Sequence, residues 1–394
     1  MHSCSGTTSC GRGSSDRIGQ GRPARASMAQ SKERNLRQDV FIGVMVTLGL
    51  FVAVEAGARV YHHFFPPRPS IWRYQQFDPR LGFTLRPNFH ERGIRINSRG
   101  FRGEEFETTK PPGVFRIVAL GDSTTFGLGE SDDATYSRHL EMLLNAKRAK
   151  ACPVRYEVIN GGVEGYSTRY VLARLRYDVI PIQPDLVFVY VGWNNLFGLN
   201  PERPETSVNP VDLFNIALRK SLVLRKATWF LFSNIMPRLE EVTPQRTEIF
   251  RRRIEAYRRF SPQQFYEEYG EILDTAHSAG IRVAVGTLTG LLDAKGWESR
   301  QRIMHFPHFT TKPELMAILE ERYNDAIRRV AAERGVPVVD LQAGVRGAPE
   351  GAAGFFFDTM HMYPKGYEFL ASVIAAEFER AALLPCPPSR KAGK

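Results

Sequence analysis

Residues 185–191, DLVFVYV, are the sequence feature that most constrains the fold. Six of these seven residues are apolar and most are β-branched or aromatic, which is typical of a strand buried on both faces of a parallel sheet. Further segments of similar character occur at 115–120, 156–160, 281–288 and 336–341. Helical patterns alternate with these segments, at 133–150, 168–180, 262–279, 312–334 and 364–382. The alternation predicts an α/β protein with three α/β/α layers and a flavodoxin-like sheet of about five parallel strands.

The composition divides the chain into four parts. Residues 1–39 are rich in Gly, Ser and Arg, and we expect a disordered basic N-terminus there. The apolar character of residues 40–60 predicts a transmembrane signal anchor. The turn-forming residues in 61–113 predict a linker and an extended lead-in. The α/β domain is expected at 114–384. Residues 196–260 separate the third strand from the next helix–strand unit, which predicts a helical insertion.

The apolar tract that begins at residue 40 indicates export. It runs for 15 residues without a charge. A membrane span needs about 20 apolar residues and a signal-peptide core about 7–15, so an uncleaved anchor or a signal peptide cleaved near Ala58 fits the tract. We favour the anchor because aromatic residues follow it. Residues 1–39 carry seven Lys and Arg against three Asp and Glu. This asymmetry predicts a cytoplasmic N-terminus and a single-pass protein whose main domain lies on the periplasmic or extracytoplasmic side.

The overall charge is basic, with 53 Lys and Arg against 42 Asp and Glu and a net charge of +11. Such a charge is compatible with nucleic-acid binding, but the chain contains no recognisable nucleic-acid module, and export argues against that partner. We therefore expect no nucleic-acid partner. The oligomeric state is left open.

Four cysteines are too few for a disulfide scaffold. In a flavodoxin-like strand order, the helices preceding Cys152 and Cys386 share a face of the sheet. A disulfide between these two residues suits an exported domain, and two free thiols fit the sequence nearly as well.

The first candidate for chemistry lies where the first strand ends, in Gly121-Asp122-Ser123-Thr124. A serine on a tight strand-to-helix turn exposes its hydroxyl beside the backbone N–H groups of the helix N-terminus. In this position Ser123 fits a nucleophile, and it equally fits a simple helix cap.

A second candidate precedes the last helix, where Asp358 and His361 are three residues apart. At this spacing a carboxylate can fix the tautomer of the imidazole, which leaves the other ring nitrogen free to accept a proton from a serine. A buried aspartate beside a surface histidine is the alternative interpretation.

Candidate donors for a negatively charged oxygen follow the second and third strands. The second strand leads into the segment 160–167, which contains Gly165, and the third leads into Gly192-Trp193-Asn194-Asn195. Glycine lets a backbone N–H approach a substrate, and the side chain of Asn194 supplies a further donor. Each segment taken alone also fits an ordinary strand-to-helix turn.

In combination and in this order, the four segments resemble the SGNH (GDSL-type) hydrolase superfamily over residues 114–384. The resemblance implies that Ser123 is the nucleophile and contributes an oxyanion N–H. It implies that Gly165 and Asn194 complete the oxyanion hole, and that His361 and Asp358 complete a catalytic triad. Asn195 departs from the aspartate that the family places there. The family needs no cofactor and no metal.

The resemblance implies an exported serine hydrolase that cleaves acyl esters of a lipid or an envelope saccharide through an acyl-enzyme. An O-acyltransferase acting on glycans, or a non-catalytic envelope protein with the same fold, is the alternative. The segment 211–232 predicts a basic amphipathic helix, which fits a cap on the core as well as it fits a lid or a membrane-surface helix. Trp193 and Tyr166 beside the site are candidates for stacking on a sugar ring.

The spacing of His305 and His308 suggests a metal pair. Pro307 stands between them and interrupts a helical face. We therefore expect no metal site there.

Overall fold

The computed structural model describes residues 23–64, 71–147, 152–199, 201, 221, 223–224, 246–307, 309–349 and 351–385. The chain forms two units. The first comprises Met1–Phe64 with Ser221–Val223, and the second comprises Phe65–Lys220 with Leu224–Lys394.

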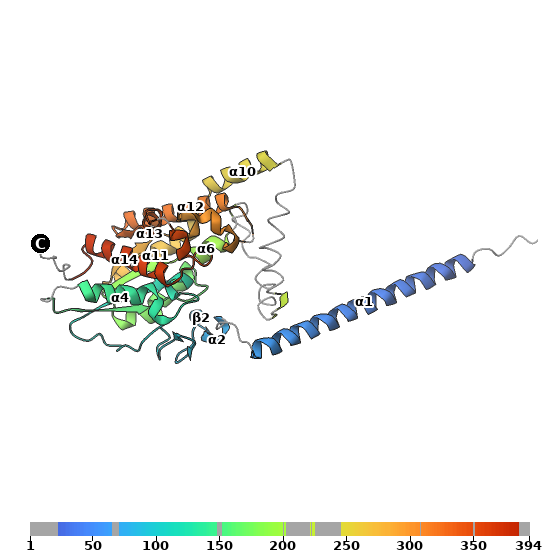
Figure 1. The fold of residues 1–394 in the computed structure, drawn as a ribbon, viewed down its shortest axis with the longest axis horizontal. Coiled ribbons are helices and arrows are strands. Elements are labelled where there is room, and N and C mark those ends of the chain that lie inside the picture. The colour runs from blue at the N-terminus through green and yellow to red at the C-terminus, as the bar shows by residue number, and fades with distance from the viewer. Residues whose placement is uncertain are drawn as a thin grey trace, which may run out of the picture. The chain divides into compact units, whose positions relative to one another are not determined.

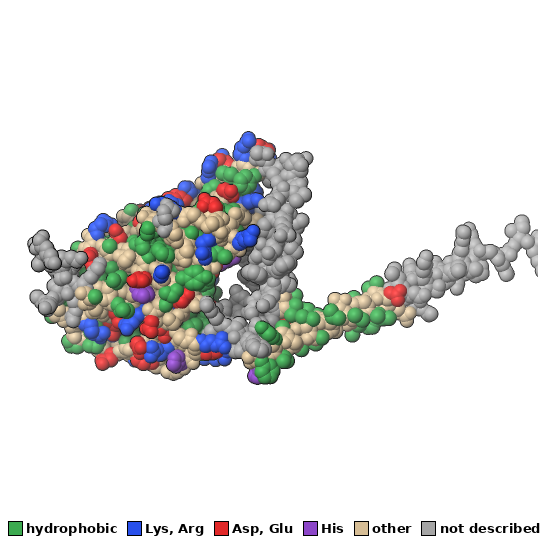
Figure 2. Space-filling view, in the orientation of Figure 1, with side chains coloured by type: hydrophobic (Ala, Val, Ile, Leu, Met, Phe, Trp, Pro, Cys, Tyr) green, Lys and Arg blue, Asp and Glu red, His purple; other side chains and the backbone are tan. Residues whose placement is uncertain are grey.

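The first unit contains α1 (Pro23–Phe64), a single helix of 42 residues (Figure 1). Within it, the 24 residues Gln38–Tyr61 are long and apolar enough to cross a membrane, a property that signal sequences share. Hydrophobic side chains cover this stretch (Figure 2). Glu55, near the end of this stretch, is paired with Arg59 one turn later at 2.8 Å.

The expectation of disorder at 1–39 is wrong for residues 23–39, whose backbone is helical. Pro23 occupies the first helical position, where its missing N–H is not needed. Ala, Arg, Lys, Gln, Glu, Leu and Met dominate the stretch that follows, and these residues lose little freedom in a helix. The stretch is continuous with the helical apolar tract, so good helix formers can extend the helix toward the N-terminus without a new nucleus. Residues 1–22 lie outside the described residues.

The second unit is built on a parallel sheet whose strands lie in the order β6-β5-β7-β8-β9. The strands are β5 (Val114–Gly121), β6 (Arg155–Asn160), β7 (Leu186–Tyr190), β8 (Arg282–Gly286) and β9 (Val338–Val339). All five residues of β7 are buried, as the apolar run at 185–191 predicts. The strand β9 is shorter than the predicted 336–341 at both ends. Pro337 lacks the N–H needed to extend the ladder, and Asp340 already caps the following helix. The predicted five-stranded flavodoxin-like sheet is confirmed.

Helices cover both faces of this sheet (Figure 1). The helix α4 (Tyr136–Lys147) packs on α14 (Pro364–Arg380) over one face. Over the other face, α11 (Gln263–Ser278) packs between α5 (Thr168–Arg174) and α12 (Pro313–Glu333). The other helices and helical turns are α2 (Ile71–Tyr74), α3 (Ser123–Phe126), η1 (Asp132–Ala134), η2 (Leu175–Val179), η3 (Ile180–Ile182), α6 (Trp193–Gly198), α10 (Arg246–Arg259), η5 (Leu291–Asp293), η6 (Trp297–Ile303), α13 (Leu341–Arg346) and η7 (Ala352–Phe355).

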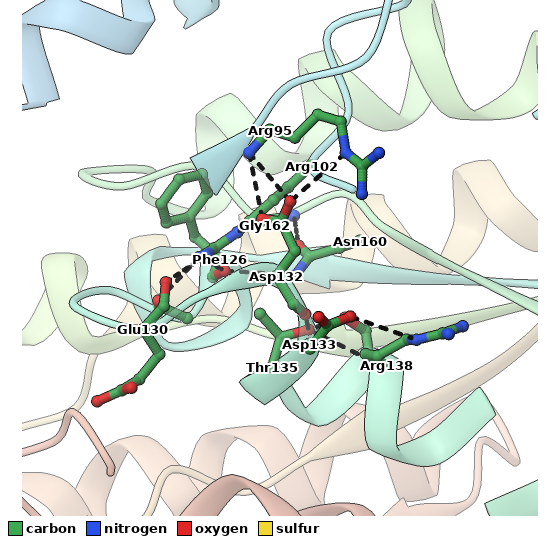
Figure 3. A network of polar contacts seen from close by, with 12 residues as sticks. Arg95, Arg102, Phe126, Glu130, Asp132, Asp133, Thr135, Arg138, Asn160 and Gly162 are labelled. Carbon is green, nitrogen blue, oxygen red and sulfur yellow. Dashed lines mark hydrogen bonds and ion pairs between the residues drawn. The ribbon is translucent and has the colours of Figure 1, made fainter. Parts of the chain in front are cut away.

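The lead-in before the sheet forms two small antiparallel hairpins. The first pairs β1 (Gln75–Asp78) with β2 (Gly82–Leu85), and the second pairs β3 (His90–Glu91) with β4 (Ile94–Arg95). After them, the buried side chain of Arg102 enters the second unit's core, where it ties the lead-in to the segment that follows α3 (Figure 3). Its guanidinium donates to the carbonyls of Phe126 and Gly127 and pairs with Asp132 at 2.9 Å.

Two predictions concern parts of the chain that the structure describes only in part. The predicted helix at 211–232 lies almost entirely outside the described residues. Cys152 is disulfide-bonded. The other three cysteines lie outside the described residues, so pairing with Cys386 stays a prediction.

At the carboxyl edge of the sheet, the backbone at Gly162 lies against the backbone of α3, so a substitution of Gly162 tests this packing. A Cβ atom at Gly162 would lie 2.2 Å from the backbone nitrogen of Phe126 in α3. We expect Gly162→Ala to displace α3 and to lower the free energy of unfolding by about 1–3 kcal/mol. The measurement is the unfolding temperature of the detergent-purified chain.

Gly198→Ala is the matched control for Gly162→Ala, because nothing lies within 4 Å of the position that its Cβ would take. Equal unfolding temperatures for the two variants would contradict the packing described.

Candidate active site

The turn between β5 and α3 places Ser123 at the carboxyl edge of the sheet. A Cβ atom at Gly121 would lie 2.1 Å from the carbonyl oxygen of Tyr190, so β5 and β7 approach as closely as glycine permits. The side chain of Asp122 caps α3 by accepting from the backbone N–H of Thr124 at 3.0 Å and from its hydroxyl at 2.7 Å. Because Asp122 provides the cap, the Ser123 hydroxyl is available for another partner.

That partner is His361. Its Nε2 lies 2.7 Å from the Ser123 hydroxyl oxygen, across a separation of 238 residues. Its Nδ1 lies 2.7 Å from Oδ2 of Asp358. The other carboxylate oxygen, Oδ1, accepts from the backbone N–H groups of His361 at 2.8 Å and Met360 at 3.0 Å. The structure thus joins the three predicted residues in one hydrogen-bonded chain.

The carboxyl of Asp358 is held in its ionised form. Burial opposes ionisation, but the hydrogen bonds and the charge of His361 outweigh it, and the pKa of Asp358 lies below its usual value. By contrast, burial raises the pKa of Asp122, although hydrogen bonds from Thr124 oppose the shift. An ionised Asp358 keeps the imidazole in the tautomer that presents a bare Nε2 to Ser123.

The predicted oxyanion donors lie on the loops after β6 and β7. Gly165 is exposed and has a φ of +83°, a conformation that favours glycine. Within the described part of the chain, no acceptor meets the backbone N–H of Gly165 or of Ser123. The amide nitrogen of Asn194 donates one proton to the carbonyl of Tyr166 at 2.8 Å, and its other proton has no partner among the described residues. Among the described residues, these three donors therefore have no protein acceptor, as the predicted oxyanion hole requires.

Asn195, where the family pattern has aspartate, has a structural role. Its amide nitrogen donates to the Thr168 hydroxyl at 2.8 Å, and its oxygen accepts from the Thr168 N–H at 3.1 Å. The Thr168 hydroxyl donates its own proton to Glu268. Residue 195 must therefore supply a donor to that hydroxyl, which asparagine can do and an ionised aspartate cannot.

Two aromatic residues do not take the positions expected for sugar stacking. Trp193 is 2% exposed and Tyr166 is completely buried. Both pack into the core at the end of the sheet, so their rings are closed to a substrate. The two large rings are instead part of the buried core next to Gly165 and Asn194.

Two further groups lie beside the site: His305, which the sequence suggested only as half of a metal pair, and Glu164, which no sequence motif marked. His305 stacks over His361 with ring centroids 6.4 Å apart, and its Nδ1 lies 3.9 Å from Oδ2 of Asp358. Glu164, next to Gly165, is buried, and its carboxylate accepts from the Tyr74 hydroxyl. Contacts of this kind join residues far apart in the chain and leave no local pattern.

Metal binding has no support in the described part of the chain. No group of three or more His, Cys, Asp or Glu side chains among the described residues could hold a metal ion. His308 lies outside the described residues.

Residues 119–369 match the GDSL-like Lipase/Acylhydrolase family, which is nearly two thirds of the chain. The chain belongs to this family. It is therefore a hydrolase of carboxylic esters, and the predicted resemblance is confirmed. No curated protein matches the chain.

Several solved structures resemble the chain. One is the lipase/acylhydrolase from Enterococcus faecalis, at 19% identity, with 70% of this chain and 98% of that chain covered and a TM-score of 0.39. A second is a catalytic mutant of an acetylxylan esterase from Geobacillus stearothermophilus, at 16% identity, with 66% and 93% covered and a TM-score of 0.40. A third is a GDSL-like lipase from Bacteroides thetaiotaomicron, at 15% identity, with 68% and 89% covered and a TM-score of 0.38.

The buried carboxyl of Glu164 makes stability depend on pH. Burial raises its pKa from 4.5 to about 7, although the hydrogen bond from Tyr74 opposes the shift. Between these two values the folded state holds a proton that the unfolded state releases, so stability falls as pH rises through this window. We expect Glu164→Gln to remove this loss, which amounts to about 3 kcal/mol above pH 7. The unfolding temperature of the variant should therefore exceed that of the wild type by more at pH 8 than at pH 5.

Glu298→Gln is the control for Glu164→Gln, because it removes an equal charge from an exposed position. A temperature difference between wild type and Glu164→Gln that does not change with pH would contradict the burial of an ionisable group at 164.

Proposed function

We propose that the protein is an exported, membrane-anchored serine hydrolase that cleaves acyl esters through an acyl-enzyme on Ser123. The observation that carries the proposal is the position of His361, which lies within hydrogen-bond distance of both the Ser123 hydroxyl and the Asp358 carboxylate. This is the arrangement that converts a serine hydroxyl into a nucleophile.

In the acylation step, the oxygen of Ser123 attacks the carbonyl carbon of the ester, and its proton passes to Nε2 of His361. The imidazolium that forms is stabilised by the ionised Asp358. The carbonyl oxygen becomes negative in the tetrahedral intermediate and accepts from the N–H groups of Ser123 and Gly165 and from the amide of Asn194. The intermediate then expels the alcohol, which takes the proton from His361.

In the second step, water gives a proton to His361 and attacks the acyl-enzyme. Collapse of the second intermediate releases the carboxylic acid and returns the proton to Ser123. Transfer of the acyl group to a glycan hydroxyl would use the same acyl-enzyme and differs only in the acceptor. The hydrogen-bonded chain from Ser123 to Asp358 argues against a non-catalytic role, which would not require it.

The N-terminal helix supports an anchored location. We propose that residues 40–60 span the membrane and that the basic residues before them hold the N-terminus in the cytoplasm. The catalytic domain, residues 114–384, would then meet its substrate on the extracytoplasmic side. Esters of envelope saccharides and of lipids are the substrate classes available there.

Hydrolysis of 4-nitrophenyl acetate by the full chain in detergent tests the proposal. We expect Ser123→Ala to lower kcat by more than about 10³-fold, because it removes the nucleophile. Ser372→Ala, on the exposed side of α14, is the matched control and should retain the wild-type rate. If wild type and Ser123→Ala release nitrophenol at the same rate, the assignment of Ser123 is wrong.

A further inference from the structure

The peptide between Glu164 and Gly165 carries one of the proposed oxyanion donors. Its N–H belongs to Gly165, which has no side chain and a φ of +83°. No group among the described residues accepts from this N–H. Its direction therefore depends on what holds the other atoms of the same peptide.

The carbonyl of that peptide is held by Gln75 from the lead-in. The side-chain nitrogen of Gln75 donates to the carbonyl oxygen of Glu164 at 2.9 Å, and the Gln75 side chain is buried. In a planar trans peptide, C=O and N–H point in opposite directions. Fixing the carbonyl toward Gln75 therefore directs the N–H of Gly165 away from the lead-in. The hydrogen bond also polarises the peptide and strengthens its N–H as a donor.

The neighbouring residue, Tyr74, holds the same loop by its side chain. Its hydroxyl donates to the buried carboxylate of Glu164. Its ring stacks on Phe126, the last residue of α3, with centroids 5.2 Å apart and an angle of 11°. Tyr74 thus connects the loop of the proposed oxyanion donor to the helix that begins with Ser123.

The residue after Gly165 is held from two sides. The hydroxyl of Tyr166 donates to the carbonyl of Phe83 in β2 at 2.7 Å, and the ring of Phe83 packs edge-on against it. The carbonyl of Tyr166 accepts from Asn194 at 2.8 Å. Both ends of the glycine are therefore fixed, and the lead-in supplies a contact at each end.

We propose that Gln75 and Tyr74 are positioning residues of the oxyanion hole. Gln75 directs the N–H of Gly165 through the shared peptide, and Tyr74 fixes the adjacent Glu164. The inference rests on the proposed function and extends the site to a segment outside residues 119–369, which carry the family match. Donors that meet charge only in the transition state affect kcat more than substrate binding.

Gln75→Met tests the proposal, because methionine keeps the length and volume of glutamine and removes its donor. With the full chain and 4-nitrophenyl acetate, we expect kcat to fall by about 10- to 100-fold while KM changes less than about twofold. Inhibition by phenylboronic acid, which forms a tetrahedral adduct with a serine oxygen, should weaken by a similar factor. Gln76→Met is the matched control, since Gln76 is exposed on the same strand. It should keep wild-type kcat and wild-type inhibition.

Tyr74→Phe is a second variant that retains the ring stacked on Phe126. We expect it to lower kcat and boronate affinity together, with the unfolding temperature monitored in parallel. If Gln75→Met fails to fold, the kcat and boronate affinity of Tyr74→Phe test the positioning role on their own.

Two results would overturn the inference while leaving the proposed function intact. One is wild-type kcat in both lead-in variants, with Ser123→Ala inactive. The other is a loss of kcat with unchanged boronate affinity, which would place the defect outside the oxyanion hole. If the wild type is no faster than Ser123→Ala, the proposed function itself fails.

Discussion

The parallel pairing of β5 between β6 and β7 is the constraint on which the site depends. Parallel strands end at the same edge of a sheet, so the turn at Ser123 and the loops after Asn160 and Tyr190 are adjacent. The strands and the helix α3 pack so closely at this edge that only glycine fits at 121 and 162. A shift of any one strand would separate the Ser123 hydroxyl from the proposed oxyanion donors on the other two loops.

The C-terminal segment completes this edge. In the loop before α14, backbone N–H groups donate to the carboxylate of Asp358. The imidazole of His361 from the same loop lies within hydrogen-bond distance of the Ser123 hydroxyl. The lead-in also contacts the end of α3. Arg102 donates to the carbonyl of Phe126, and the ring of Tyr74 stacks on the ring of the same residue. The groups of the proposed site are therefore held by three parts of the chain: the carboxyl edge of the sheet, the segment before α14 and the lead-in.

Much of the fold and of the candidate site could be predicted, because both leave local patterns. Apolar runs such as 185–191 mark buried strands, and the residues that follow them fall at the carboxyl edge. The spacing of Asp358 and His361 is also local. The helical backbone of residues 23–39 does not follow from their polar, basic composition, but it agrees with the helix propensity of their Ala, Lys, Glu and Arg residues.

The rest depends on contacts that have no local pattern. Gln75 and Tyr74 are ordinary residues in sequence, and they gain a role only when the lead-in folds against a loop 89 or 90 residues later. The burial of Trp193 follows from packing on neighbouring elements and could not be inferred from its position next to Asn194. The reason for Asn195 likewise becomes visible only through Thr168 and Glu268.

The central claim is that Ser123 is a nucleophile activated by His361. A fluorophosphonate reagent tests it directly, because an activated serine oxygen displaces fluoride and keeps the phosphonyl group, which mass mapping can locate. The account predicts one adduct per chain, on the peptide that contains Ser123, and no adduct in Ser123→Ala. An adduct on a different residue, or labelling that persists in Ser123→Ala, would contradict it.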